Sequence, residues 1–359
     1  MINVCLRPFQ FSSQGYEIIP ESDSSLVDDH DENQQPSTIP RLRFLEDTVT
    51  ETDPQRQALR RAAQETRDVL QVTLSDLKTT EEANRSKKIS IDSYRRLRRS
   101  ECPRLPSRAR VQVMNEDTLN VAIRLFQKAQ RNSFNRDSRE LRPIIINFAS
   151  HRKPGGGWLN GAMAQEEAIC YRSSLALSLN EKDYPLCLHE AIYSPYVLVM
   201  REDLASGHVL MTRTTRPEDL PMVSVITIAA ICRPRLDEDC LNTDGKRPHD
   251  QTSSSSSSSC RQTQQIFARD RDRDLTKNKM KLALRIAARN KHQMLVLGAL
   301  GCGVYANPPD DIAKCWLEVL TEFEFSEGNW WSDVCFAVYD VKNEGNFEVF
   351  TNVLAGKRV

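Results

Sequence analysis

The chain has 359 residues, of which 39% are hydrophobic, so it is long enough for one large or two modest domains with a substantial core. Its formal net charge is zero, which gives no overall reason to expect nucleic acid or an acidic membrane surface as a partner. The ten cysteines show neither a CxxC pair nor a zinc-ligand spacing, and buried free thiols in a reducing compartment explain them most simply.

Residues 1–54 are predicted to be a disordered acidic tail. They are polar and rich in Asp, Glu, Ser and Gln, and they cannot bury enough apolar surface to offset the entropy of ordering. The first residues show no sustained apolar stretch of the secretory type, and no run of eighteen apolar residues occurs anywhere in the chain. We therefore expect no membrane partner and a nuclear or cytoplasmic location.

Residues 55–109 are predicted to form an N-terminal helical accessory region. The segment RQALRRAAQETRDVLQVTL places Leu59, Ala62, Ala63, Val69 and Leu70 near one helix face, with arginines on the opposite face. A basic stretch, YRRLRR, follows at 94–99. It is typical either of a solvated face or of a surface for a polyanion, and the sequence leaves both readings open.

The core domain is predicted to span 110–357, interrupted by a polar insert at 234–265. The insert contains seven consecutive serines and is predicted to be disordered. Apolar runs predict strands at 111–114, 143–149, 196–200, 222–230, 294–298 and 333–339, and helical periodicity predicts helices at 119–129, 164–179, 275–290 and 310–322. This alternation predicts an α/β fold with helices on both faces of a parallel or mixed sheet.

Two glycine-rich segments follow strands of this predicted sheet. Gly155, Gly156 and Gly157 come after the strand at 143–149, and LGALGCGVYANPP comes after the strand at 294–298. Ligands bind beyond the carboxyl ends of such strands, so the two segments are expected to frame one site. Exposed backbone amides suit phosphate or nucleotide binding, although each segment alone also fits a structural turn.

A glutamine and two glutamates, Gln165, Glu166 and Glu167, open the helix predicted after the first glycine segment. Acids at a helix start are favoured by the helix dipole, which is one explanation for the pair. The other is acid/base catalysis at a glycosidic bond, with only one carboxyl aimed at the substrate. The six histidines show no paired spacing, so neither a metal nor another cofactor is expected.

The segment NFASHRKPGGGWLNGAMAQEEAICYRSSL resembles the signature of the microbial-type poly(ADP-ribose) glycohydrolases, in which GGG precedes QEE by a similar spacing. MLVLGALGCGVYANPPDDIAKCW resembles the family's diphosphate loop, IYSPYVLVMRED resembles a third block, and LRRAAQETRDVL is similar to its accessory helix. The resemblance implies a macrodomain-like three-layer α/β/α fold with a mixed sheet and an N-terminal helical extension.

The resemblance also implies hydrolysis of the ribose–ribose O-glycosidic bond in poly(ADP-ribose), without a metal. Glu167 would be the catalytic acid/base, Glu166 would hold ribose hydroxyls, Asn147 would lie at the ribose end of the site, and Tyr305 would pack on the terminal ribose. The implied substrate-binding residues are Asn147, Gly155, Gly156, Gly157, Gln165, Gly298, Gly301, Cys302, Gly303, Val304 and Tyr305. The expected partners are poly(ADP-ribose) or ADP-ribosylated proteins.

The chain departs from the family pattern at two places near the expected ligand. AAIC, residues 229–232, stands where the family often has AAPN, and Leu300 stands where it often has a tryptophan. The first change removes one polar contact expected near the adenine or the distal ribose. A mono-ADP-ribosyl hydrolase and a non-catalytic ADP-ribose-binding module are the alternative functions, and the intact QEE favours an enzyme.

Overall fold

The computed structural model describes residues 53–131, 141–241 and 262–359 of the chain. Nine strands are described, namely β1 (Lys87–Ser90), β2 (Val111–Met114), β3 (Ile144–Phe148), β4 (Glu190–Leu198), β5 (Met222–Ile228), β6 (Leu236–Leu241), β7 (Gln262–Phe267), β8 (Met294–Gly298) and β9 (Asp333–Ala337). The α-helices of these ranges are α1 (Pro54–Asp76), α2 (Thr80–Ala83), α3 (Thr118–Arg131), α4 (Gln165–Arg172), α5 (Leu175–Ser178), α6 (Asp270–Arg289), α7 (Pro309–Thr321), α8 (Phe323–Ser326) and α9 (Asn346–Leu354).

Seven strands form one mixed sheet in the order β1-β4-β5-β3-β8-β9-β2. The five strands β5, β3, β8, β9 and β2 run parallel to one another, whereas β4 is antiparallel to both β1 and β5. The carboxyl ends of β5, β3 and β8 therefore lie together at one edge of the sheet. This edge is where parallel sheets place their ligands.

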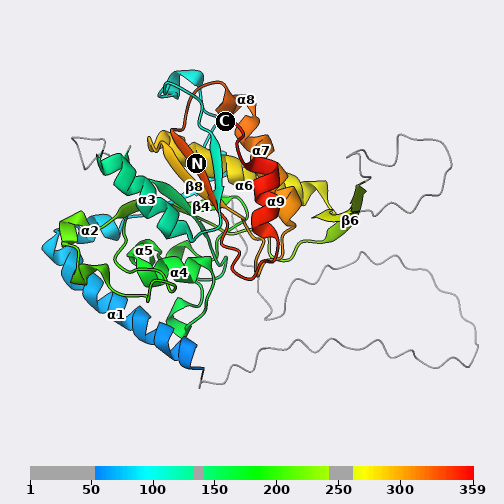
Figure 1. The fold of residues 1–359 in the computed structure, drawn as a ribbon. Coiled ribbons are helices and arrows are strands. Elements are labelled where there is room, and N and C mark those ends of the chain that lie inside the picture. The colour runs from blue at the N-terminus through cyan, green and yellow to red at the C-terminus, as the bar shows by residue number, and fades with distance from the viewer. Residues whose placement is uncertain (1–52, 132–140, 242–261) are drawn as a thin grey trace, which may run out of the picture. The chain divides into compact units, whose positions relative to one another are not determined.

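Alternate residues of the strands pack into two separate cores, one on each face of the sheet. Ile144 and Ile146 of β3 join the core that includes α6, α7 and α9, whereas Ile145 joins the core that includes α1, α3, α4 and α5. Figure 1 shows these two groups of helices on either side of the sheet. The three-layer α/β/α fold with a mixed sheet is confirmed.

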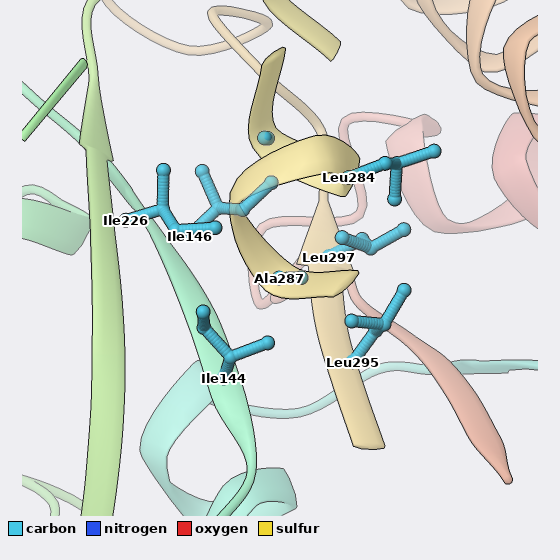
Figure 2. A pocket seen from close by; sticks show the side chains of 8 residues that line it. Ile144, Ile146, Ile226, Leu284, Ala287, Leu295 and Leu297 are labelled. Carbon is cyan, nitrogen blue, oxygen red and sulfur yellow. The ribbon is translucent and has the colours of Figure 1, made fainter. Parts of the chain in front are cut away.

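The contact between α6 and the sheet is filled by aliphatic side chains. Figure 2 shows Ile146, Ile226 and Leu297 from three neighbouring strands facing Leu284 and Ala287 of the helix. The void between them measures about 10 Å³, which is close to the lower limit for a single water molecule, and its lining offers no polar partner for one. This region is core packing.

Helix α1 is built for packing along its whole length. Asp53 caps its N-terminus by accepting the N–H of Gln55 at 3.0 Å, and Pro54 occupies the first position, where its missing N–H is not needed. The buried residues recur at helical spacing and include Leu59, Ala63 and Leu70. The accessory region predicted at 55–109 is helical here but not throughout, because β1 extends the main sheet at its edge.

The polar insert predicted to be disordered at 234–265 contains two strands. β6 and β7 pair as an antiparallel ribbon in which Leu236 is opposite Phe267 and Leu241 is opposite Gln262. Phe267 is buried beside α7, and this burial anchors a ribbon that has no apolar alternation of its own. The predicted disorder is therefore wrong at both ends of the insert, while 242–261 and the tail at 1–52 lie outside the described residues.

The predicted helix at 164–179 is two helices. α4 ends at Arg172 and α5 begins at Leu175, because Ser173 and Ser174 between them have extended or irregular backbone. The Ser173 hydroxyl donates to the carbonyl of Ile169, and the Ser174 hydroxyl accepts the N–H of Leu198. These bonds replace helical ones and are typical of serine at a helix end.

Candidate active site

The two glycine-rich segments leave neighbouring parallel strands and meet each other. β3 pairs with β8, and the loops that follow them begin at the same edge of the sheet. The backbone N–H of His151 donates to the Tyr305 hydroxyl at 3.3 Å, and His151 Nδ1 lies 3.1 Å from the same oxygen. The two loops are therefore in contact at the carboxyl ends of β3 and β8, and the single site that they are expected to frame stays a prediction.

Gln165 fixes the start of α4 against the end of β3. Its Oε1 accepts the N–H of Phe148 at 2.8 Å, and its Nε2 donates to the carbonyl of Ile146 at 2.7 Å and to Thr118 Oγ1 at 3.3 Å. The amide is thus occupied by the protein itself. Gln165 positions the two glutamates that follow it, and its predicted contact with substrate is not supported by this geometry.

Glu166 is buried at the carboxyl end of β3, with 2% of its surface exposed. Its Oε2 accepts the N–H of Ser150 at 2.7 Å and its Oε1 accepts Asn147 Nδ2 at 3.2 Å. Burial raises the pKa of this carboxyl to about 7, and the hydrogen bonds from Ser150 and Asn147 only partly oppose that shift. Asn147 Oδ1 is buried and has no hydrogen-bond partner among the described residues.

Glu167 points to the triglycine loop, away from the contacts of Glu166. Its Oε1 accepts the N–H of Gly157 at 2.8 Å, and its Oε2 accepts the N–H of Ala164 at 3.2 Å in a capping arrangement at the start of α4. It is 8% exposed, four times the fraction of its neighbour. The expectation that only one of the two carboxyls would face outward fits this difference.

The triglycine loop lies directly on the two carboxylates, and Gly156 makes this possible. A Cβ at Gly156 would collide with Glu167 Oε1 and would lie 3.1 Å from Glu166 Oε2. Its φ of +56° also favours glycine. Sterics therefore explain why Gly156 has no side chain. Any side chain there would displace the backbone whose Gly157 N–H binds Glu167.

The second glycine segment is a tight turn supported from below by Asn307. Gly301 has a φ of +78°, and a Cβ there would lie 2.5 Å from both Ala230 Cβ and Asn307 Nδ2. Asn307 is buried and donates to the carbonyls of Ile231 at 2.7 Å and Tyr305 at 3.2 Å. Asn307 was not predicted, and the only signal for it is an amide within an otherwise apolar and proline-rich stretch.

The tip of this turn is open, as a ligand-binding loop requires. Gly303 has nothing within 4 Å of a would-be Cβ, Val304 is 73% exposed, and Cys302 is half-buried. Gly298 differs from them because it lies inside β8, where a Cβ would stand 2.8 Å from the carbonyl oxygen of Ala337. The absence of a side chain at Gly298 thus serves the packing of β8 on β9, and its contact with a ligand stays a prediction.

The segment 229–232, which departs from the family pattern, still supports the turn. Ala230 packs on Gly301, and the carbonyl of Ile231 accepts from Asn307. The next residue, Arg233, donates its N–H to the carbonyl of Tyr305 at 2.8 Å. This segment and Arg233 thus support the glycine turn through packing and main-chain contacts.

Helix α1 contacts the segment that follows the triglycine loop, which the sequence did not reveal. Gly161 has a φ of +80°, and a Cβ there would lie 2.6 Å from the carbonyl oxygen of Arg56. Arg60 Nε donates to the carbonyl of Asn160 at 3.3 Å. The Thr66 hydroxyl, further along α1, donates to a main-chain carbonyl of α4 at 2.7 Å. The loop is therefore held between α1 and the two glutamates.

None of the helices that the structure describes combines the length and apolar character that a bilayer crossing requires. Within the described ranges, no three His, Cys, Asp or Glu side chains gather closely enough to hold a metal ion. The polar groups of the site are carboxylates, amides and main-chain N–H groups. Such a set suits proton transfer and the binding of hydroxyls and phosphates.

Comparisons with known proteins agree with this site. Residues 51–202 match the family model described as the microbial-type PARG catalytic domain. Poly(ADP-ribose) glycohydrolase (PARG) from Thermomonospora curvata superposes with a TM-score of 0.59 at 22% identity, covering 83% of this chain and 99% of that chain. The same enzyme bound to the inhibitor ADP-HPD gives 0.58 at 23% identity, with the same coverage of both chains.

A mutant of the Deinococcus radiodurans enzyme in complex with ADP-ribose gives a TM-score of 0.54 at 25% identity, covering 75% of this chain and 94% of that one. A comparison with curated protein sequences found no match. The family match includes α1, the triglycine loop and the QEE segment, and it places the chain among glycosidase-type hydrolases. Residues 51–202 are thus similar to the microbial-type PARG catalytic domain, in agreement with the resemblance seen in the sequence.

Proposed function

We propose that this protein hydrolyses the ribose–ribose O-glycosidic bonds of poly(ADP-ribose) and releases ADP-ribose, with Glu167 as the general acid/base. The observation that carries the proposal is the position of the Glu167 carboxyl, 2.8 Å from the Gly157 N–H and beneath the loop that faces the glycine turn of β8. Related structures in complex with ADP-ribose and with ADP-HPD support the same ligand class for this chain.

In the proposed reaction Glu167 first protonates the ribose oxygen that leaves. The anomeric carbon then carries oxocarbenium-like positive charge, which the nearby carboxylates stabilise. Glu167, now ionised, takes a proton from the attacking water, so that the carboxyl regains its starting state. No metal takes part in this scheme, since each proton moves to or from one carboxyl group.

The remaining residues bind and orient the substrate in this proposal. Glu166, held by Ser150 and Asn147, binds ribose hydroxyls. The Oδ1 of Asn147, which has no partner among the described residues, accepts a hydrogen bond from a ribose hydroxyl. The amides of Gly301, Gly303 and Val304 bind the diphosphate, whereas the predicted Cys302 amide already donates to the Ala299 carbonyl at 3.1 Å. Tyr305 packs on the terminal ribose. The left-handed turn at Gly301 supports this role because it lets successive amides face outward.

The test is the release of free ADP-ribose from labelled poly(ADP-ribose) attached to an automodified polymerase. Glu167→Ala and Glu167→Gln are expected to lower kcat by at least about a hundredfold, the range for removing a positioned acid/base. Glu167→Gln keeps an acceptor for the Gly157 N–H and loses only the acceptor for the Ala164 N–H, so the fold should persist and the loss of activity should report chemistry. Glu181→Gln, an exposed glutamate outside the site, is the matched control and should retain full activity.

Two results would contradict the proposal. Wild-type rates in both Glu167 variants would remove Glu167 from the acid/base role. A wild-type protein that binds ADP-ribose but releases none from the polymer would instead be a binding module. Release from mono-ADP-ribosylated protein but not from polymer would identify a mono-ADP-ribosyl hydrolase.

A further inference from the structure

Three exposed cations lie directly outside the candidate active site. Arg152 and Lys153 follow Ser150, whose N–H binds Glu166, and Arg233 lies on the other side of the site after β5. None of the three pairs with an acid among the residues that the structure describes. We call Arg152, Lys153 and Arg233 the basic rim.

Main-chain contacts tie both halves of the basic rim to the residues of the site. The carbonyl of Lys153 accepts the N–H of Gly156, the glycine that packs on the two glutamates. The N–H of Arg233 donates to the Tyr305 carbonyl at 2.8 Å, with Arg233 in a left-handed conformation at φ +49°. Because the Tyr305 hydroxyl also contacts His151, Tyr305 joins the two halves.

The acids next to the glycine turn do not neutralise the basic rim. Asp311 is buried and paired with Arg273, whose Nε lies 2.7 Å from Asp311 Oδ1. Asp310 is half-buried. Burial raises the pKa of its carboxyl above the ordinary value, and the positive charge of Lys314 opposes that shift. Among the described residues, neither of these acids forms an ion pair with the basic rim.

Poly(ADP-ribose) has a repeating pyrophosphate, and the proposed site accounts for only one of them. In the proposed function, the amides of Gly301, Gly303 and Val304 receive the pyrophosphate of the unit being released. A polymer brings a second pyrophosphate from the preceding unit, which a single ADP-ribosyl group lacks. Arginine and lysine side chains are the usual partners for such phosphates.

We propose that Arg152, Lys153 and Arg233 bind the pyrophosphate of the ADP-ribose unit that precedes the bond being cleaved, and that this contact gives the site a preference for polymer. The proposal rests on the proposed function, since it deepens the substrate choice of the same site. The basic rim, which lies outside the pair Glu166 and Glu167, thereby distinguishes polymer from single ADP-ribosyl groups.

The chain offers a matched control surface at the opposite end of the sheet. Arg95, Arg98 and Arg104 are also exposed, and the segment that carries them lies beside the C-terminus of α6, where Arg289 Nη2 donates to the Arg95 carbonyl at 2.8 Å. Since α6 ends just before β8 begins, this segment lies at the amino ends of the strands. Removing these charges alters the net charge equally but far from the site.

The experiment compares two triple variants of the full chain, each in a Glu167→Gln background that prevents cleavage. One carries Arg152→Gln, Lys153→Gln and Arg233→Gln, and the other carries Arg95→Gln, Arg98→Gln and Arg104→Gln. Binding of labelled poly(ADP-ribose) of defined length and of ADP-ribose is measured over a salt series. The rim variant is expected to bind polymer about tenfold more weakly near 0.15 M salt, with a log–log salt slope shallower by about two.

ADP-ribose affinity should stay within about twofold in both variants, and the control variant should bind polymer as the background protein does. Equal polymer affinity and slope in the two triple variants would overturn the proposal. So would a rim variant that loses ADP-ribose affinity as strongly as polymer affinity. Displacement of polymer by single-stranded DNA at equal phosphate concentration would show a general polyanion surface and would also overturn it.

The two proposals fail separately. A protein with Glu167 intact that releases no ADP-ribose from polymer would refute the proposed hydrolysis, and the binding comparison would still decide the role of the basic rim. Conversely, normal hydrolysis together with an unchanged salt slope in the rim variant would refute the rim alone.

Discussion

Glu166 and Glu167 are neighbours in sequence, yet the fold gives them different surroundings. Glu166 turns to the end of β3 and is bound by Ser150 and Asn147, whereas Glu167 turns to the triglycine loop. Adjacent residues of a helix point about 100° apart, so one helix start can serve two separate contacts. The pair therefore divides into a more deeply buried carboxyl and a more accessible one.

Glu166 predicts a pH dependence of stability. Its pKa in the folded protein is about 7, above the ordinary value of 4.5, so the folded state holds a proton that the unfolded state has lost. The raised pKa of Glu166 makes its full contribution to the free energy of unfolding below pH 4.5, and this contribution is lost as the pH rises through 7. Relative to Glu166→Gln, the wild type should lose about 3 kcal/mol of unfolding free energy over that range.

Denaturant unfolding of both proteins at several pH values between 4.5 and 8 measures this difference. In Glu166→Gln, rotation of the Asn147 amide can present its unpaired Oδ1 to the Nε2 of the new glutamine. The variant therefore keeps a hydrogen bond between the two side chains. His208, whose pKa burial lowers to about 4, titrates in both proteins and cancels. A difference that does not change with pH would show that Glu166 is ionised in the folded state throughout.

Glu318→Gln provides a control of opposite sign. The hydrogen bond from Arg273 lowers the pKa of Glu318, so its contribution to stability is present above the ordinary pKa and is lost as the pH falls. Between pH 5 and 8 the difference between wild type and Glu318→Gln should therefore stay constant.

At the scale of elements, α1 packs on the segment that follows the triglycine loop and on α4, and it is not a detached extension. Its first turns contact the loop at Asn160 and Gly161, and its middle contacts α4 through Thr66. The buried Arg201 adds to this joint, since it binds Glu65 of α1 at 2.7 Å and donates to the Thr66 hydroxyl at 3.1 Å.

Gly161→Ala tests whether α1 positions the catalytic loop. The new Cβ would lie 2.6 Å from the Arg56 carbonyl, so either α1 or the loop that carries Gly157 must move. We expect kcat to fall about tenfold or more at temperatures where the variant remains folded, because misplacing a catalytic contact by a fraction of an ångström is costly. The KM for polymer should change less, since the glycine turn of β8 is untouched.

Gly345→Ala separates this effect from backbone strain. Gly345 also has a positive φ, +95°, but a Cβ there meets nothing within 4 Å. It should destabilise the protein through its backbone conformation by about 1 kcal/mol and leave kcat unchanged. A similar kcat in both alanine variants would show that α1 does not position the loop.

Much of the sheet could be predicted because its central strands are buried on both faces. β3 and β8 appear as continuous apolar runs that end at polar or glycine-rich turns. β1 could not be predicted in this way, since Ile89 is its only fully buried residue and its strand form depends on pairing with β4. The ribbon of β6 and β7 is likewise fixed by pairing, not by a local pattern.

The candidate site was predictable where its parts are close in sequence. The triglycine loop and the two glutamates lie within thirteen residues, from 155 to 167, and each imposes a recognisable composition. The packing role of Gly298 could not be predicted, because the sequence does not show that β9 lies against it. Asn307 and the contact of Gly161 with Arg56 join segments far apart in the chain, and no periodicity reveals such contacts.

At the scale of the molecule, a net charge of zero conceals two separate basic surfaces. The basic segment around 95–108 lies at the amino ends of β8 and β9, where Arg99 lies 3.4 Å from Glu327 and Leu105 donates to the Asn329 carbonyl. The basic rim lies at the carboxyl ends, beside the glutamates. A polymer bound at the site would therefore contact the basic rim, which lies beside the site, and not the segment around 95–108, although that segment has more arginines.

The chain between β6 and β7 offers a last prediction on the organisation of the molecule. Leu241 and Gln262 are opposite each other in the ribbon, so the ends of the segment 242–261 are already adjacent. Replacing that segment with Asn-Gly, a turn suited to a two-residue hairpin, should leave kcat/KM on polymer unchanged. The shorter connection should also stabilise the fold by roughly 2 kcal/mol at most, since closing a shorter loop loses less entropy.

A deletion that also removes β6 and β7 provides the contrast. The N–H of Phe267 donates to Asp311 at 3.1 Å, and Lys314 Nζ donates to Gln264 at 2.8 Å, so the ribbon is bonded to α7 directly behind the glycine turn. Phe267 is buried, and its loss would expose apolar surface of the core and leave Asp311 short of a donor. The larger deletion should therefore lower both the Tm and the affinity for ADP-ribose, while the smaller one lowers neither. If the smaller deletion alone reduces kcat/KM more than about threefold, a change beyond what loop closure explains, the segment 242–261 takes part in binding or catalysis and the boundary of the catalytic domain must include it.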